Sequence, residues 1–168
     1  MSSSPEAVFQ EAQMAVENKD WERFFACLDR NDLLRIASNS VMLSLRPGNK
    51  GKNRFRAICT DYNFPLETIE AAWQSPKDYK TSLNTALKSI QNLAQFVAAL
   101  ERHNRDSIGG GSVSSKLFVG ESLVDIEIEG KRAWGTRQIS QDYSEDVGFI
   151  HKKRKWLIRL FVRRPQHK

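Results

Sequence analysis

Two arginines on predicted strands are the side chains of this sequence best suited to hold an anion. Arg159 stands between Leu157 and Phe161, and Arg137 shares its predicted strand face with Val124, Ile126, Gly135 and Ile139. Because a guanidinium among apolar neighbours needs a partner, each should meet either an acidic side chain or an anionic ligand bound through two hydrogen bonds. For Arg159 the internal partner would be Asp146, diagonally across a hairpin.

Three further side chains belong to this candidate ligand pocket. Trp134 could form a wall of the pocket or simply pack against a helix. Asp125 alternates with Val124 along a predicted strand, so it could be a solvated acid or a pocket acid. Tyr143 could supply a proton. The three histidines lie in separate segments: His103, His151 and His167. No acid–base pair is recognised, and no catalytic residue is assigned.

Basic side chains are concentrated in two short segments. Residues 151–168 hold eight Lys/Arg and residues 46–56 hold five, with no acid in either, which leaves 13 bases against 20 acids elsewhere. This distribution suits polyanion binding, although two solvated segments would produce it too. The polyanion-contact candidates are Lys50, Lys52, Arg54, Arg56, Lys152, Lys153, Arg154, Lys155, Arg163 and Arg164.

The sequence gives little indication of a metal site, a cofactor site or a membrane segment. Cys27 and Cys59 are far apart in the chain and lack paired histidine ligands, so we expect reduced thiols near the core, with a disulfide as the alternative. The glycines of 48–52 and 109–111 do not match phosphate-binding loops. We predict no metal site, no cofactor and no membrane segment. Unless a signal peptide has been removed, a cytoplasmic location is expected.

Helices are predicted for the first two thirds of the chain. Capping residues and apolar periodicity place them over about 5–18, 21–28, 32–45, 54–61 and 65–73. Ser75 and Pro76 open the longest helix, whose apolar stripe continues to Leu100. The glycine-containing residues 46–53 and 105–115 are expected to be loops.

The last third is predicted to be an antiparallel meander. Alternating apolar residues from Val124 to Ile128 lead through the turn Gly130–Lys131 to a second strand, 133–139. A second hairpin turns at Lys153–Arg154. Folding it about this turn gives four cross-strand pairs: His151 with Trp156, Ile150 with Leu157, Phe149 with Ile158, and Gly148 with Arg159. Helices followed by antiparallel strands indicate an α+β fold, with N-terminal helices packed on a C-terminal curved sheet.

Two segments are similar to the NTF2-like (cystatin-like, SnoaL-like) superfamily. The first, ENKDWERFFACLD, has the Asp-Trp pair that follows the opening helix in such domains. The second, LVDIEIEGKRAWGTRQISQDYSEDVGFIHKKRKWLIRLF, ends in the family's final hairpin pattern, here Gly148 and Phe149 before the turn and Trp156 and Ile158 after it. The resemblance implies a cone-shaped antiparallel sheet.

The extent of this resemblance implies a domain organisation. It covers about residues 4–45 and 116–162, and the whole chain, 1–168, would then be a single NTF2-like domain. Residues 46–115 would be a helical insertion before the sheet, and residues 163–168 a basic tail.

Three functions are compatible with this sequence. The resemblance, without an acid–base constellation, implies a non-catalytic domain that binds a small ligand, which could be anionic, or a protein partner, and that could form a homodimer. The first alternative is a polyanion- or nucleic-acid-binding protein that uses residues 46–56 and 151–168. The second is a pocket enzyme of the isomerase or dehydratase type, with Asp125 or Tyr143 as acid or base. Fold alone does not choose between them.

Overall fold

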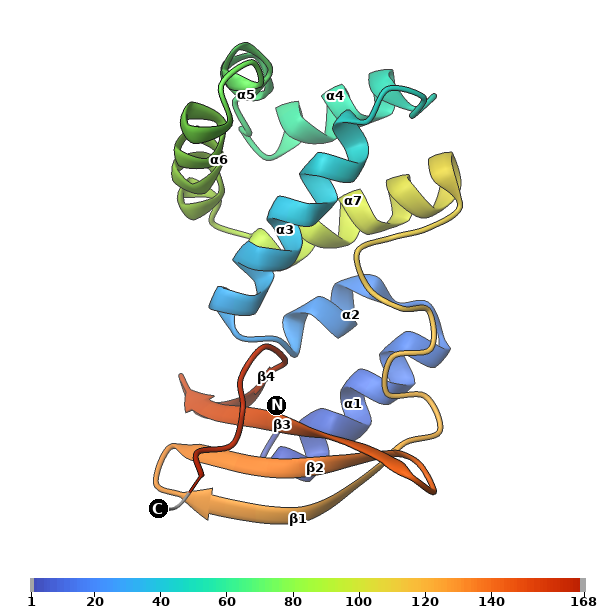
Figure 1. Cartoon of the computed structure of the whole chain (residues 1–168), viewed down its shortest axis with the longest axis vertical. Coiled ribbons are helices and arrows are strands. Elements are labelled where there is room, and N and C mark those ends of the chain that lie inside the picture. Colours follow the sequence, from blue (N-terminus) through green and yellow to red (C-terminus); the bar gives the residue numbers. More distant parts are fainter. Residues whose placement is uncertain (1, 167–168) are drawn as a thin grey trace. The chain divides into compact units, whose positions relative to one another are not determined.

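The chain forms two compact units (Figure 1). The computed structural model describes residues 2–166, so His167 and Lys168, the end of the predicted basic tail, lie outside the described residues. The first unit takes in the residues up to Asp32 and those from Ser115 onward, and the second is Leu33–Ser114. The predicted insertion, 46–115, falls within the second unit except for its last residue.

The first unit contains the sheet, and the predicted α+β class is confirmed. Four antiparallel strands follow one another in the order β1-β2-β3-β4, which is the expected meander. The strands, orange to red in Figure 1, are β1 (Ser122–Glu129), β2 (Arg132–Ser140), β3 (Tyr143–Lys152) and β4 (Lys155–Arg159).

Two N-terminal helices supply the core on one face of this sheet. Ser4 caps α1 (Pro5–Glu17) through a hydrogen bond from the Ala7 amide, and Asp20 caps α2 (Trp21–Ala26). Helix α1 packs on the sheet, and aromatic rings of both helices pack with a ring from the segment before β1. The fully buried aromatic side chains here are Phe9, Phe24, Phe25, Phe118 and Phe149.

The β3–β4 hairpin has the predicted register. All four predicted pairs are present, including His151 with Trp156 and Gly148 with Arg159. Phe149 and Ile158 are buried, so their face of the hairpin is the core face. The backbone groups of Ile158 on its free side bond to Cys27 and Asp29, so the connection after α2 covers the edge of β4.

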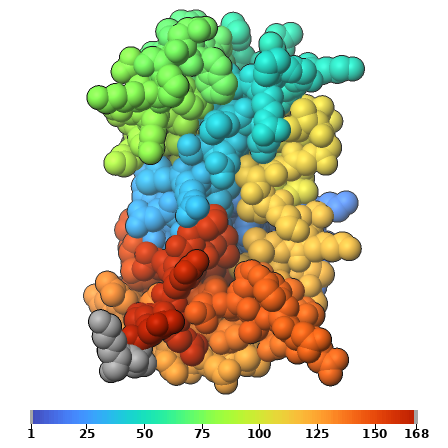
Figure 2. Space-filling model, viewed as in Figure 1, coloured from blue at the N-terminus to red at the C-terminus, as the bar shows by residue number. Residues whose placement is uncertain are grey.

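The segment after β4 crosses the outer face of the sheet, opposite α1. Val162 lies over Gly148, where an added Cβ would come within 2.5 Å of the Val162 side chain. Further along, the Arg164 guanidinium donates to the carbonyl of Asp125 at 2.8 Å and lies 3.8 Å from the Glu127 carboxylate. Figure 2 shows this dark-red segment lying on the orange strands.

Strand β1 departs from the predicted alternation. Its register shifts between Val124 and Glu127, at a bulge where Asp125 has φ +52°. Arg137 therefore lies opposite Leu123, while Val124 lies opposite Thr136, so the predicted shared face of Arg137 and Val124 is wrong. A regular period of two cannot anticipate one extra residue.

The second unit is helical. Its helices are α3 (Arg30–Leu45), whose first residues belong to the first unit, α4 (Lys52–Asp61), α5 (Leu66–Ala72), α6 (Pro76–Ser89) and α7 (Leu93–Ile108). The single long helix predicted from Pro76 to Leu100 is wrong, because the chain is extended at Ile90 and a new helix starts at Leu93. In the new helix Phe96 is fully buried.

The predicted loop over 105–115 begins later than expected. Helix α7 continues to Ile108 and ends at Gly109, which has the left-handed conformation of a helix C-cap. The following residues are fixed to α7, because the buried Glu101 carboxylate accepts from the Ser112 amide at 2.9 Å and Arg105 donates to the Val113 carbonyl at 2.7 Å. Among residues 2–166, no helix is long and apolar enough to span a membrane.

Candidate functional site

Arg137, one of the two arginines predicted to bind an anion, is hydrogen-bonded to acidic side chains of its own chain. Its Nε and one terminal nitrogen each donate to the buried Glu121 carboxylate at 2.7 Å, and the other terminal nitrogen donates to Glu145 at 3.2 Å. The guanidinium also lies 4.8 Å from the centre of the Phe118 ring. The geometry thus gives Arg137 the internal partner that a buried cation requires.

Tyr143 lies near Arg137 but at the solvent side of it. Its hydroxyl donates to Glu145, and this hydrogen bond, together with the negative charge of Glu145, raises the pKa of the Tyr143 phenol above its usual value. The side chain is largely exposed. A raised pKa disfavours the phenolate, so this environment does not activate Tyr143 as a base.

Of the other three pocket candidates, Trp134 and Arg159 lie on the outer face, whereas Asp125 is an exposed residue at the β1 bulge whose carbonyl accepts from Arg164. Trp134 and Arg159 both contact the position of Gly148, beside Val162. Arg159 lies 4.0 Å from Asp29, and the predicted pairing with Asp146 is wrong because the Asp146 carboxylate accepts from the Arg164 amide instead. The five candidates therefore do not converge on one site, and the segment after β4 occupies the space beside Trp134.

The two predicted polyanion-contact segments belong to different compact units. In the helical unit, Arg54 pairs with Asp106 at 2.8 Å and Arg56 lies 4.0 Å from Glu70. In the sheet unit, Lys152 pairs with Asp29 at 2.7 Å. The described part of the tail contributes Arg163, which is exposed, and Arg164, which is bonded to β1.

A basic hollow lies where two hairpin turns meet at one end of the sheet. The β1–β2 turn and the β3–β4 turn are neighbours because Arg132, the first residue of β2, pairs with Ile150 near the end of β3. The Lys131 carbonyl also accepts from the His151 amide at 2.8 Å. Both turns lie at the left end of the strands in Figure 1. We call this open hollow of about 700 Å³ the basic cup; its lining residues are Lys131, Arg132, Ile150, His151, Lys152, Lys153 and Arg154.

The basic cup contains five cationic side chains and no acid among its lining residues. Of the five, only Lys152 has a carboxylate partner within the described part of the chain. His151 packs against Trp156 with ring centres 5.3 Å apart, as predicted, so it forms part of the wall. Sequence reasoning identified the β3–β4 turn but missed Lys131 and Arg132, whose proximity depends on the register of β2 against β3.

The β3–β4 turn has an unusual composition for its geometry. Both central residues are left-handed, with φ +48° at Lys153 and +66° at Arg154, and Lys152 pairs directly with Lys155. A two-residue turn of this type favours Asn-Gly, and like charges placed opposite each other destabilise a hairpin. The residues of this turn are therefore unfavourable for its backbone conformation. Such a conflict between sequence and local structure is typical of functional positions.

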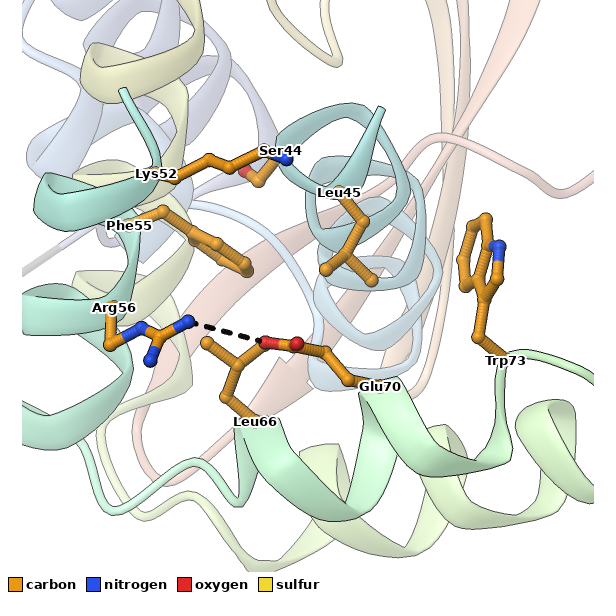
Figure 3. Close-up of a pocket in the computed structure, with 8 residues that line it drawn as sticks. All are labelled: Ser44, Leu45, Lys52, Phe55, Arg56, Leu66, Glu70 and Trp73. Atoms are coloured by element: carbon orange, nitrogen blue, oxygen red, sulfur yellow. Dashed lines mark ion pairs between the residues drawn. The ribbon is translucent and has the colours of Figure 1, made fainter. Parts of the chain in front are cut away.

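The helical unit has a separate groove between the end of α3, α4 and α5 (Figure 3). Its volume is about 290 Å³. A second hollow of about 260 Å³ adjoins it and shares Arg56 and Leu66. We call the first hollow the helical groove; its lining residues are Ser44, Leu45, Lys52, Phe55, Arg56, Leu66, Glu70 and Trp73.

The cysteines and the acidic residues show no reactive or metal-binding arrangement. Cys27 and Cys59 are free and buried, as predicted, and burial raises the pKa of each thiol to about 12. Within residues 2–166 no cluster of His, Cys, Asp and Glu could hold a metal ion.

Comparisons of this chain with protein-family models, with curated proteins and with solved structures found no significant match. Function is therefore inferred from the residues and their geometry.

Proposed function

We propose that this protein binds the phosphate backbone of nucleic acid through the basic cup. The observation that supports the proposal is the meeting of two hairpin turns that gather five cations around one hollow with no acid among its lining residues; of the five, Lys152 is paired with Asp29. Lys and Arg side chains that contact phosphates release condensed counterions, and this release drives binding without reading the base sequence.

The form of the site favours contact with the backbone over recognition of bases. Base-specific readers place a helix or strand in a groove, or expose aromatic rings for stacking. In the basic cup the one ring system near the cations, His151, is packed against Trp156. We therefore expect affinities that depend on charge and on salt, and hardly on sequence.

Paired substitutions test this function. Lys153→Gln with Arg154→Gln, and separately Lys131→Gln with Arg132→Gln, each remove two charges from opposite sides of the cup. Binding of a fluorescently labelled single-stranded oligonucleotide, measured by anisotropy at low salt, should weaken about tenfold in each variant. Lys77→Gln with Lys80→Gln on α6 removes the same charge from exposed positions elsewhere and should leave the affinity nearly unchanged.

Two results would contradict the proposal. One is the absence of binding by the unaltered protein at low salt. The other is an equal loss of affinity in the control on α6, because net charge alone would then account for binding. Equal affinities for oligonucleotides of unrelated sequence would support contact with the backbone.

The NTF2-like relationship is a further hypothesis about this chain. Helices packed on one face of a curved antiparallel sheet support it, as does the hairpin pattern with Phe149 and Ile158 on the core face. We do not place a ligand in the sheet itself, because Arg137 is bonded to Glu121 and the outer face beside Trp134 holds Val162. Phosphate binding at the basic cup does not depend on this relationship.

A further inference from the structure

The helical groove combines an apolar floor with a charged rim. Phe55 and Leu66 are almost fully buried and present their side chains to the groove, and Leu45 lies opposite Phe55 (Figure 3). Trp73, at the end of α5, is 43% exposed and packs edge-on against Tyr79 at 4.7 Å between ring centres. A large exposed ring beside a hollow adds apolar surface for a ligand to cover.

The rim of the helical groove has more positive than negative charge. Its charged residues are Lys52, Arg56 and Glu70. The Arg56–Glu70 pair is loose, at 4.0 Å, with side chains 66% and 47% exposed. Lys52 has no carboxylate partner among residues 2–166, and its side chain extends along the rim to Ser44 (Figure 3). One negative charge placed between Lys52 and Arg56 would balance this rim.

The size of the groove restricts the ligand. About 290 Å³ is just below the range for small-molecule pockets, roughly 300–1,000 Å³. Such pockets are mostly apolar, with a few polar groups that fix orientation. A ligand that suits the helical groove is therefore short, mainly apolar and singly negative.

We propose that the helical groove binds an apolar monocarboxylate, such as a medium-chain fatty acid. The carboxylate lies between Lys52 and Arg56, and the hydrocarbon chain covers Phe55, Leu66 and the exposed face of Trp73. The Glu70 carboxylate competes with the ligand for Arg56. This site lies in the other compact unit from the basic cup, so it is independent of the proposed function.

Two matched probes test the role of the charge. Titration calorimetry with decanoate and with decanol compares ligands that share the hydrocarbon chain and differ in the charged group. We expect decanoate to bind and decanol, which lacks the negative charge, to bind at least about fivefold more weakly. The expected difference is modest because each exposed cation contributes little by itself. Equal affinities would overturn the role of Lys52 and Arg56, and no binding of either probe would overturn the site.

Substitutions of opposite sign test the position of the carboxylate. Lys52→Gln should weaken decanoate binding about two- to fivefold, and Glu70→Gln should strengthen it by a similar factor because the competing acid is gone. Neither change should affect decanol. Lys77→Gln is the matched control. All three residues are exposed, so the variants should retain the fold.

Amide chemical-shift mapping with decanoate locates the bound ligand. Shifts confined to α4, α5 and the end of α3 would agree with the proposal. Shifts at the two hairpin turns instead would overturn it and would show that decanoate binds only to the basic cup. Loss of oligonucleotide binding in the cup variants would leave the decanoate result unchanged.

Discussion

Arg137 and Arg159 carry the same charge in the same sheet but have different surroundings. The Arg137 side chain is 9% exposed and makes two hydrogen bonds to Glu121, which is itself only 7% exposed. Arg159 is more open and lies at the limit of ion-pair distance from Asp29. The alternation pattern predicted that each arginine needs a partner. It could not identify Glu121 as the partner of Arg137, because Glu121 precedes β1.

Arg137→Gln should destabilise the protein strongly, because it leaves the buried Glu121 charge without its partner. We expect the free energy of unfolding, measured by urea denaturation, to fall by about 3–5 kcal/mol. Arg159→Gln is the matched control and should cost about 1 kcal/mol or less. Similar losses for the two variants would contradict a buried ion pair between Arg137 and Glu121.

His103 is a buried histidine whose surroundings disfavour the charged form of its ring. It stacks on Phe55 with ring centres 6.1 Å apart, and its Nε2 is buried without a hydrogen-bond partner within the described part of the chain. Burial, and secondarily the positive charge of Arg54, lower the pKa of His103 below 6.5, while Asp106 acts in the opposite direction. In the unfolded chain the imidazole regains its ordinary pKa.

Stability should therefore decrease as the pH falls below about 6.5. In that range the unfolded state binds a proton at His103 that the folded state does not, so protonation favours unfolding until the lowered folded pKa is also passed. The urea midpoint of the unaltered protein should fall between pH 7.5 and pH 5.5, and His103→Gln should reduce this fall. His151→Gln is the control; a fall that depends on His151 and not on His103 would contradict the account.

Among the elements, the β3–β4 turn shows a conflict between local structure and charge. Lys153 and Arg154 occupy left-handed positions that cost a residue with a side chain about 1 kcal/mol or more. Four basic residues in a row add repulsion within the turn. A turn selected for stability alone would carry Asn-Gly.

Lys153→Asn with Arg154→Gly should thus stabilise the protein and weaken oligonucleotide binding at once. We expect the free energy of unfolding to rise by about 1–2 kcal/mol, measured by urea denaturation. Lys153→Gln with Arg154→Gln keeps the backbone cost and removes only the charges, so it should give a smaller gain. A destabilised Asn-Gly variant would contradict the assigned turn geometry.

The elements also show which patterns a sequence can resolve. The β3–β4 register follows from one turn and two apolar strands, and all four pairs were predicted correctly. The break at Ile90 carries no proline or glycine, so the apolar stripe predicted one helix where there are two. The basic cup was only half predicted, because Lys131 and Arg132 join Lys152–Arg154 through pairing between different hairpins. In a four-stranded meander the first and third turns lie at the same end of the sheet. The predicted turn at Gly130–Lys131 could therefore have indicated that Lys131 and Arg132 lie near the β3–β4 turn.

At the scale of the whole molecule, net charge does not explain the basic cup. The helical unit holds 11 Lys/Arg and 6 Asp/Glu, whereas the remaining residues, which form the sheet unit, hold 15 and 14. The basic cup therefore belongs to the unit whose positive and negative charges are nearly equal in number. A local arrangement of charge, and not a general excess, distinguishes it, and for this reason a charge-matched control on α6 is informative.

The salt dependence of oligonucleotide binding is the sharpest test of phosphate binding at the basic cup. Anisotropy titrations at several salt concentrations give the slope of log K against log salt, which is about −0.7 for each single-strand phosphate contact. We expect a negative slope for the unaltered protein, a slope smaller in magnitude by about 1.4 for Lys153→Gln with Arg154→Gln, and no change for Lys77→Gln with Lys80→Gln. A slope that is the same in the unaltered protein and the cup variant would contradict phosphate binding at the basic cup.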